Sequence, residues 1–113
     1  MALIYPNIVR ALFVVPSVPV APVPGTAFAL LAAAGVSSDA IYQGQGDFDV
    51  TLDQALAVTQ GVFVGTPVAG IGIDATVSYE YVSDTVRSIR HFDAGVTDDG
   101  FSSSWAVFCL PNA

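Results

Sequence analysis

The sequence predicts a mostly β protein: an antiparallel β-sandwich or jelly-roll-like barrel, preceded by an extended, proline-rich N-terminal arm. From residue 47 onward, short runs rich in β-branched and aromatic residues alternate with turns rich in Gly, Asp and Ser. Before them, residues 16–25 hold four of the seven prolines, which fix φ and favour extended backbone. We therefore divide the chain into an apolar arm, residues 1–40, and a sandwich domain, residues 41–113.

Two short elements are expected within residues 1–40. Residues 8–15, Ile-Val-Arg-Ala-Leu-Phe-Val-Val, are β-branched and aromatic and favour a strand. Residues 27–34 are rich in alanine and leucine and are followed by Gly35, a residue that often ends helices. This composition predicts one or two turns of helix there.

The proline-rich part of the arm is unusual because valine and alanine stand between its prolines. Such side chains are costly to leave in water, so the arm needs a surface to lie on. That surface is either its own domain or a neighbouring subunit, and a flexible tail is the third alternative. On the second interpretation, the residues in contact between subunits are Pro16, Val18, Pro19, Val20, Pro22, Val23 and Pro24.

The strands of the sandwich are placed by alternation of apolar and polar residues. Residues 48–52, 75–81, 84–92 and 101–110 alternate, whereas residues 62–66 form a continuous apolar run that Pro67 closes. Residues 93–100 have the composition of a turn. The alternation predicts a core made of Phe48, Val50, Leu52, Val62, Val64, Val86, Phe92, Trp105 and Val107.

The composition leaves few charged side chains to cover a free monomer. The 113 residues are enough for one domain, with 53% hydrophobic and 12% charged residues. An average soluble domain has about 25% charged residues. We therefore expect much of the exterior to be covered by other protein subunits, including copies of the chain itself in a homo-oligomer.

The sign of the charge excludes other partners. Three arginines and no lysine oppose ten acidic residues, for a net charge of −7. Such a surface repels phosphates and anionic lipids, so neither nucleic acid nor membrane is an expected partner. The N-terminus lacks a basic start, and prolines interrupt every long apolar stretch, so we expect synthesis in a cytoplasm without a signal peptide or membrane span.

The residue types of a hydrolase are present, but their pattern is not. His91, Asp93 and the serines at 102–104 lie in strands and turns, without the strand–turn–helix elbow that exposes a serine nucleophile. Cys109, the single cysteine, is expected to be a small buried hydrophobe. The sequence therefore predicts no catalytic residue, and a protein that is not an enzyme.

No cofactor or metal is predicted. No cluster of Cys and His has metal-ligand spacing. The aspartates at 93, 98 and 99 are expected to be solvated turn residues, although carboxylates in a glycine-bearing loop are also ligands for calcium. A calcium site in residues 93–100 stays open as the alternative.

Residues 44–110 resemble small structural proteins of tailed-phage particles. The resemblance rests on Gly-Gln-Gly-Asp-Phe-Asp-Val-Thr-Leu-Asp-Gln-Ala-Leu at 44–56 and on Val-Phe-Val-Gly-Thr-Pro at 62–67. Ile-Arg-His-Phe-Asp-Ala-Gly follows at 89–95, and a closing strand at 101–108. The first 40 residues are not part of the pattern.

The resemblance implies a virion structural protein made in the host cytoplasm. The expected role is a head decoration or cement subunit that stabilises the capsid by contacts with its own copies and with the major capsid protein. A tail or fibre component is an alternative within the particle. A different class, a carbohydrate- or calcium-binding β-sandwich, would need an exposed aromatic platform, for which Tyr79, Tyr81 and Trp105 are the candidates.

Overall fold

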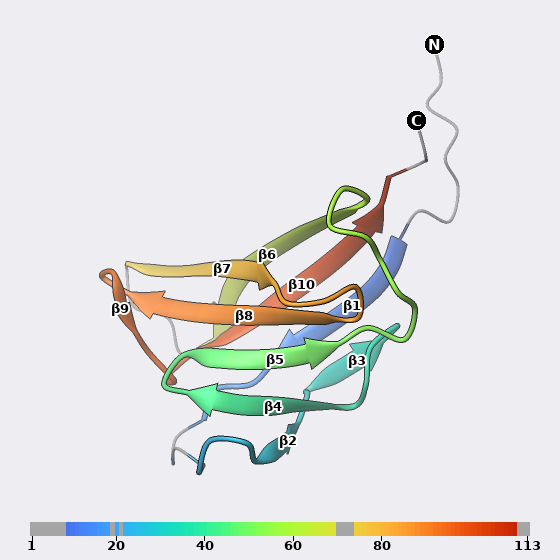
Figure 1. The fold of residues 1–113 in the computed structure, drawn as a ribbon. Coiled ribbons are helices and arrows are strands. Elements are labelled where there is room, and N and C mark those ends of the chain that lie inside the picture. Colours follow the sequence, from blue (N-terminus) through green and yellow to red (C-terminus); the bar gives the residue numbers. More distant parts are fainter. Residues whose placement is uncertain (1–8, 19, 21, 70–73, 111–113) are drawn as a thin grey trace.

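The computed structural model describes residues 9–18, 20, 22–69 and 74–110, which form ten strands in two stacked antiparallel sheets (Figure 1). Within these ranges there is no helix long and apolar enough to cross a membrane. The strands are β1 (Val9–Val15), β2 (Ala27–Ala29), β3 (Ala32–Ala34), β4 (Asp39–Gly44), β5 (Asp47–Thr51), β6 (Gly61–Ala69), β7 (Ala75–Tyr81), β8 (Val86–Asp93), β9 (Val96–Thr97) and β10 (Ser102–Cys109).

The two sheets confirm the predicted fold class. One sheet has four strands in the order β3-β1-β10-β6. The other has six, in the order β2-β4-β5-β8-β7, with β9 paired to β8. Side chains from the inner faces of both sheets form one core, as in an antiparallel β-sandwich.

The N-terminal segments are built into this sandwich. The predicted division placed an arm at residues 1–40 and the sandwich at 41–113. In the structure, however, β1 lies between β3 and β10, and β2 pairs with β4 of the other sheet. Ala11, Phe13 and Val15 of β1 are buried in the core. The predicted strand at 8–15 is confirmed over its described residues, and it is a central strand rather than part of an arm.

The predicted helical turn at residues 27–34 is wrong. Strands β2 and β3 occupy this segment, and the residues between them bond to different parts of the sandwich. Leu30 N–H donates to the Ser38 carbonyl at 2.9 Å, and Leu31 N–H donates to the Val14 carbonyl at 3.0 Å. A run of eight residues is too short to form a stable helix alone, so pairing with β1 and β4 decides its conformation.

Most of the predicted core is confirmed. Phe48, Val50 and Leu52 are buried, as are Trp105 and Val107. Phe48 contacts the rings of Phe28, Tyr42 and His91, with centroids 5.4, 5.8 and 4.9 Å away.

The predicted inward faces of β6 and β8 are wrong. In β6, Phe63 points into the core while Val62 and Val64 are exposed. In β8, the predicted Val86 and Phe92 are only half-buried. They point away from the core, on the same side of the strand as Ser88 and Arg90. The inward side chains are Arg87, Ile89 and His91.

Arg87 faces inward because it finds partners there. Its guanidinium donates to the carbonyl oxygens of Leu56, at 2.8 Å, and Ser83. It also lies 4.6 Å from the ring centroid of Tyr81 and 5.2 Å from that of Phe63. Burying a charged guanidinium costs free energy because the group loses its hydration. These hydrogen bonds and cation–π contacts offset that cost.

The proline-rich segment lies along the sandwich. Val18 packs against the core, and its N–H donates to the Asp99 carbonyl at 2.8 Å. Gly25 N–H donates to the Tyr42 carbonyl at 2.6 Å. Between these anchors, Val20 is 82% exposed and Val23 is 75% exposed. The predicted contact residue Pro19 lies outside the described residues.

Replacing Phe48 by alanine should lower the free energy of unfolding by about 3–5 kcal/mol, because it removes a fully buried ring. Urea denaturation monitored by Trp105 fluorescence measures the change. The control is Val64→Ala, which removes methyl groups from an exposed side chain and should cost less than about 1 kcal/mol. Equal losses for the two variants would contradict the assignment of the core.

Candidate functional site

The candidate site is the outer face of the four-stranded sheet, which points away from the core. Alternation along the strands defines it, since the intervening residues Phe13, Phe63 and Trp105 are buried. We use the name outer face for Leu12, Val14, Ala32, Ala34, Val62, Val64, Thr66, Val68, Ser104, Ala106 and Phe108.

The strand register brings these side chains together in rows. Leu12 stands opposite both Ala34 and Ala106, and Ala106 stands opposite Val64. In the next row Val14 lies between Ala32 and Ser104, with Thr66 beyond Ser104. Phe108 and Val62 pair at the end of the sheet. Leu12 is 54% exposed and Val64 is 55% exposed, so the rows form a continuous apolar surface.

The outer face differs from the corresponding face of the six-stranded sheet. The only charged residue in the four strands β1, β3, β6 and β10 is Arg10. On the six-stranded sheet, Ser88 Oγ donates to Asp47 Oδ1 at 2.6 Å, and Arg90 forms a 2.6 Å salt bridge with Glu80. One exposed sheet face is thus polar, as is usual for antiparallel sheets, and the other is apolar.

The inner side of the four-stranded sheet is fixed by close packing around Trp105. A Cβ on Gly65 would lie 2.5 Å from the Trp105 ring, so only glycine fits opposite it in β6. The Phe13 ring stacks at 6.2 Å from Trp105. This packing determines which side chains of β1, β6 and β10 point outward.

A buried polar chain ties the two sheets together. Trp105 Nε1–H donates to Ser103 Oγ at 2.7 Å, and that oxygen lies 2.6 Å from His91 Nε2 of β8. Because the tryptophan N–H can only donate, the serine hydroxyl hydrogen is free to bond to a neutral His91 nitrogen. The ring of His91 also stacks on Phe101 at 4.5 Å.

His91 is held in its neutral form. Burial lowers its pKa from 6.5 to about 4, and this loss of hydration outweighs the opposing interactions with the Phe101 backbone, Asp99 and Asp98. At neutral pH the side chain therefore serves as an uncharged member of the core.

The three hydrolase-type residues are only partly brought together. His91 and Ser103 form a hydrogen bond, whereas Asp93 is exposed at the end of β8. Both bonded side chains are fully buried, so a substrate has no access to the serine oxygen. The arrangement holds the sheets together and does not present a nucleophile.

The expectation that all the loop aspartates are solvated is wrong for Asp99. This residue is buried and accepts hydrogen bonds from Tyr42 Oη and from Gly46 N–H, both at 2.6 Å. Burial, together with this bond to Asp99, raises the pKa of Tyr42 to about 12. In the described ranges, no three His, Cys, Asp or Glu side chains are grouped to hold a metal ion.

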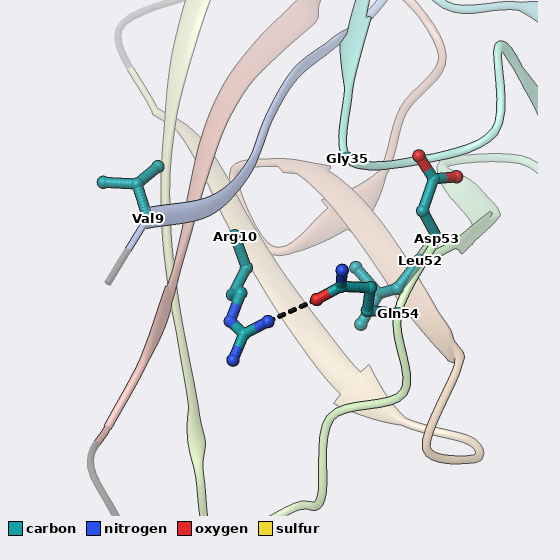
Figure 2. A pocket seen from close by; sticks show the side chains of 6 residues that line it. All are labelled: Val9, Arg10, Gly35, Leu52, Asp53 and Gln54. Carbon is teal, nitrogen blue, oxygen red and sulfur yellow. Dashed lines mark hydrogen bonds between the residues drawn. The ribbon is translucent and has the colours of Figure 1, made fainter. Parts of the chain in front are cut away.

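A pocket of about 310 Å³ is lined by the start of β1, by Gly35 and by residues 52–54, which follow β5 (Figure 2). Arg10 extends into it from β1, and its guanidinium bonds to Gln54 Oε1 and lies 3.7 Å from Cys109 Sγ. Gly35 also lines the pocket, and its position requires glycine because a Cβ there would clash with the Arg10 carbonyl. Cys109 is half-buried, against the expectation that it is fully buried.

The aromatic candidates do not form an exposed platform. Trp105 is buried, and only Tyr79 and Tyr81 are exposed at the edge of the six-stranded sheet. Tyr79 stacks on Phe63 with ring centroids 4.8 Å apart, and both residues line a groove of about 390 Å³. Tyr81 Oη donates to Asp84 and is held against its own turn.

Comparison of the chain with protein-family models, with curated proteins and with solved structures found no match. The resemblance to phage structural proteins therefore stays a prediction from the sequence motifs.

Sequence reasoning missed the outer face itself. The continuous apolar run at 62–66 was the available signal, because an exposed strand with one polar face should alternate. Val62 and Val64 were assigned to the core, but their cross-strand partners Phe108 and Ala106 are equally apolar. Apolar character alone therefore does not distinguish the inward face of these strands from the outward face.

The neutral state of His91 gives the protein a specific pH dependence. Its folded pKa of about 4 lies below the unfolded value of 6.5, so protons bind preferentially to the unfolded chain. This contribution to stability is complete above pH 6.5 and is lost as the pH falls toward 4, by about 3 kcal/mol in total. Urea denaturation between pH 7 and pH 4 measures it.

The control is His91→Gln, which cannot titrate but keeps a side-chain acceptor near Ser103. It should be less stable at pH 7 and should lose less stability on acidification. Parallel curves for the two proteins would show that His91 is not the group responsible.

Proposed function

We propose that this protein is a non-enzymatic structural subunit of a virus particle, and that it binds neighbouring protein subunits through the outer face. The observation that carries the proposal is the apolar outer face of the four-stranded sheet, in which Leu12 and Val64 are more than half exposed. Apolar patches of several hundred Å² on a soluble protein typically mark protein contacts.

The chemistry of the face favours a protein partner over a small ligand. The rows cross three strands of seven to nine residues and the short strand β3, rather than lining a closed cavity. Ligand sites usually combine a concave apolar wall with several converging polar groups. On the outer face the only polar side chains are the hydroxyls of Thr66 and Ser104.

The viral context of the proposal comes from the motifs in residues 44–110. They favour a head decoration or cement subunit whose partners are its own copies and the major capsid protein, within the virion. A small protein with an acidic net charge of −7 and an apolar docking face suits a role in which it binds to a shell already closed around nucleic acid.

A ligand-binding module is the second candidate, favoured by one observation. The groove beside Phe63 and Tyr79 has a volume of about 390 Å³ and includes the edge of the buried Trp105. Aromatic walls of this kind suit sugar rings or apolar side chains. An increase in melting temperature with soluble oligosaccharides, lost in Tyr79→Ala, would support this function instead.

The proposal is tested by Leu12→Lys. When the chain is produced together with the other components of the particle, we expect it to co-sediment with intact particles in a density gradient. An ammonium group at the centre of the face would be buried without a partner, so the bound fraction should fall by at least about tenfold.

The matched control is Val82→Lys, since Val82 is 55% exposed and Leu12 is 54% exposed, and Val82 lies outside the outer face. It adds the same charge and should leave co-sedimentation unchanged. Wild-type chain that remains at the top of the gradient, or a Leu12→Lys variant that binds as well as wild type, would refute the proposal.

The proline-rich segment is proposed as a second contact. Its anchors Val18 and Gly25 belong to the domain, so the contact would be made by the exposed Val20 and Val23. The double variant Val20→Ser/Val23→Ser should unfold at the same urea concentration as wild type but should bind particles more weakly. Unchanged binding would restrict the interface to the outer face.

A further inference from the structure

We propose that the occupant of the outer face is a second copy of this chain, packed face to face about a twofold axis that runs along the strands between β1 and β10. The inference rests on the proposed function and specifies its partner. Three properties of the face lead to it: the order of residue sizes, the absence of acidic charge, and the area.

The first property is an alternation of small and large side chains across the strands. Along one row the order is Ala34, Leu12, Ala106, Val64, which is small, large, small, large. The row beside it has the order Ala32, Val14, Ser104, Thr66, with the same alternation. Small residues on β10 thus form a furrow between ridges on β1 and β6.

Rotation about a twofold axis parallel to the strands reverses the order of the residues within each row. It leaves each row at the same position along the strands. Leu12 of one copy then lies over Ala106 of the other, and Val14 lies over Ser104. Val64 likewise lies over Ala34. Each large side chain meets a small one, so the face is complementary to itself, as an isologous interface requires. The row at the end of the sheet, Val9, Phe108 and Val62, contains only large side chains and is outside this alternation.

The second property is charge. Ten of the thirteen charged residues of the chain are acidic, so a face that carried them would meet mostly acidic charge on its copy, and this would oppose pairing. All ten acidic residues of the chain lie outside the four strands of this sheet. Arg10, the one cation in these strands, bonds to Gln54, which follows β5 of the other sheet.

The third property is size. Three of the strands are seven to nine residues long and β3 has only three residues, so at about 4.8 Å per strand the face covers roughly 430 Å². Two such faces bury about 850 Å² together, somewhat below the ~1,000 Å² at which specific interfaces begin. The pair should therefore form reversibly and depend on protein concentration, and repeated contacts in a particle would strengthen it.

The test uses two single variants that change residue size in opposite directions. In a pair of two Leu12→Ala chains, both Leu12–Ala106 contacts lose their large side chain. In a pair of two Ala106→Leu chains, leucine lies over leucine at both contacts. Mixing the two variants restores a large side chain over a small one at both positions. Fluorescence-detected sedimentation, with one variant labelled, measures association of each protein alone and in the mixture.

We expect wild type to dimerise, each variant alone to associate at least about tenfold more weakly, and the mixture to recover most of the wild-type affinity. A mixture contains no variant chain with both changes, so improved folding of one chain cannot produce the recovery. Val82→Lys, outside the face, should dimerise as wild type does. Thermal unfolding monitored by circular dichroism verifies that both size variants are folded.

Two results would overturn the inference. Wild-type chain that is monomeric at every concentration excludes a second copy as occupant. Dimers that form but are not rescued by mixing exclude this pairing. In either case, loss of particle binding by Leu12→Lys would still support the proposed function and would assign the face to a different protein. Retained particle binding would refute that function as well.

Discussion

A two-layer sandwich can bury only one face of each sheet, and this constraint governs the molecule. In the six-stranded sheet the free face is polar, with Asp47 bonded to Ser88 and Glu80 paired to Arg90. In the four-stranded sheet both faces are apolar, so packing against the partner sheet leaves Leu12 and Val64 in water. The energy lost there is recovered only when another surface covers the sheet. The fold thus buries one core but leaves an apolar sheet face exposed to water.

An apolar sheet face does not specify its own orientation, since a strand shifted by one residue would still bury valine or leucine. The orientation is specified from inside. Gly65 of β6 leaves room for the Trp105 ring. Ser103, which lies on β10 with Trp105, bonds to both Trp105 and His91. Reversing β10 would expose tryptophan and leave the buried His91 without its partner. The polar chain within the core therefore also determines which residues form the outer face.

The sequence predicted most of the strands but assigned the inward face wrongly where the two faces have a similar character, as in β6 and β8. Alternation placed Phe48, Val50 and Leu52 correctly, because their neighbours are polar. It misplaced Val62 and Val64, where every residue of the run is apolar. Residues 27–34 were expected to be helical because propensity is a local property, while their pairing with β1 and β4 is not. The outer face depends on the register of β1, β6 and β10, which no local pattern contains.

The distribution of charge bears on how two copies would approach one another in the proposed pair. Copies with a net charge of −7 repel, and this repulsion acts over about 8 Å at physiological ionic strength. In a face-to-face pair the polar faces are the outermost layers, separated by three intersheet spacings or roughly 30 Å. At that separation salt screens Asp47 and Asp49 of one copy from those of the other almost completely. Stacking through the six-stranded sheets would instead bring these carboxylates close together. In the proposed pair, repulsion on one side and an uncharged apolar surface on the other would therefore favour contact through the four-stranded sheets.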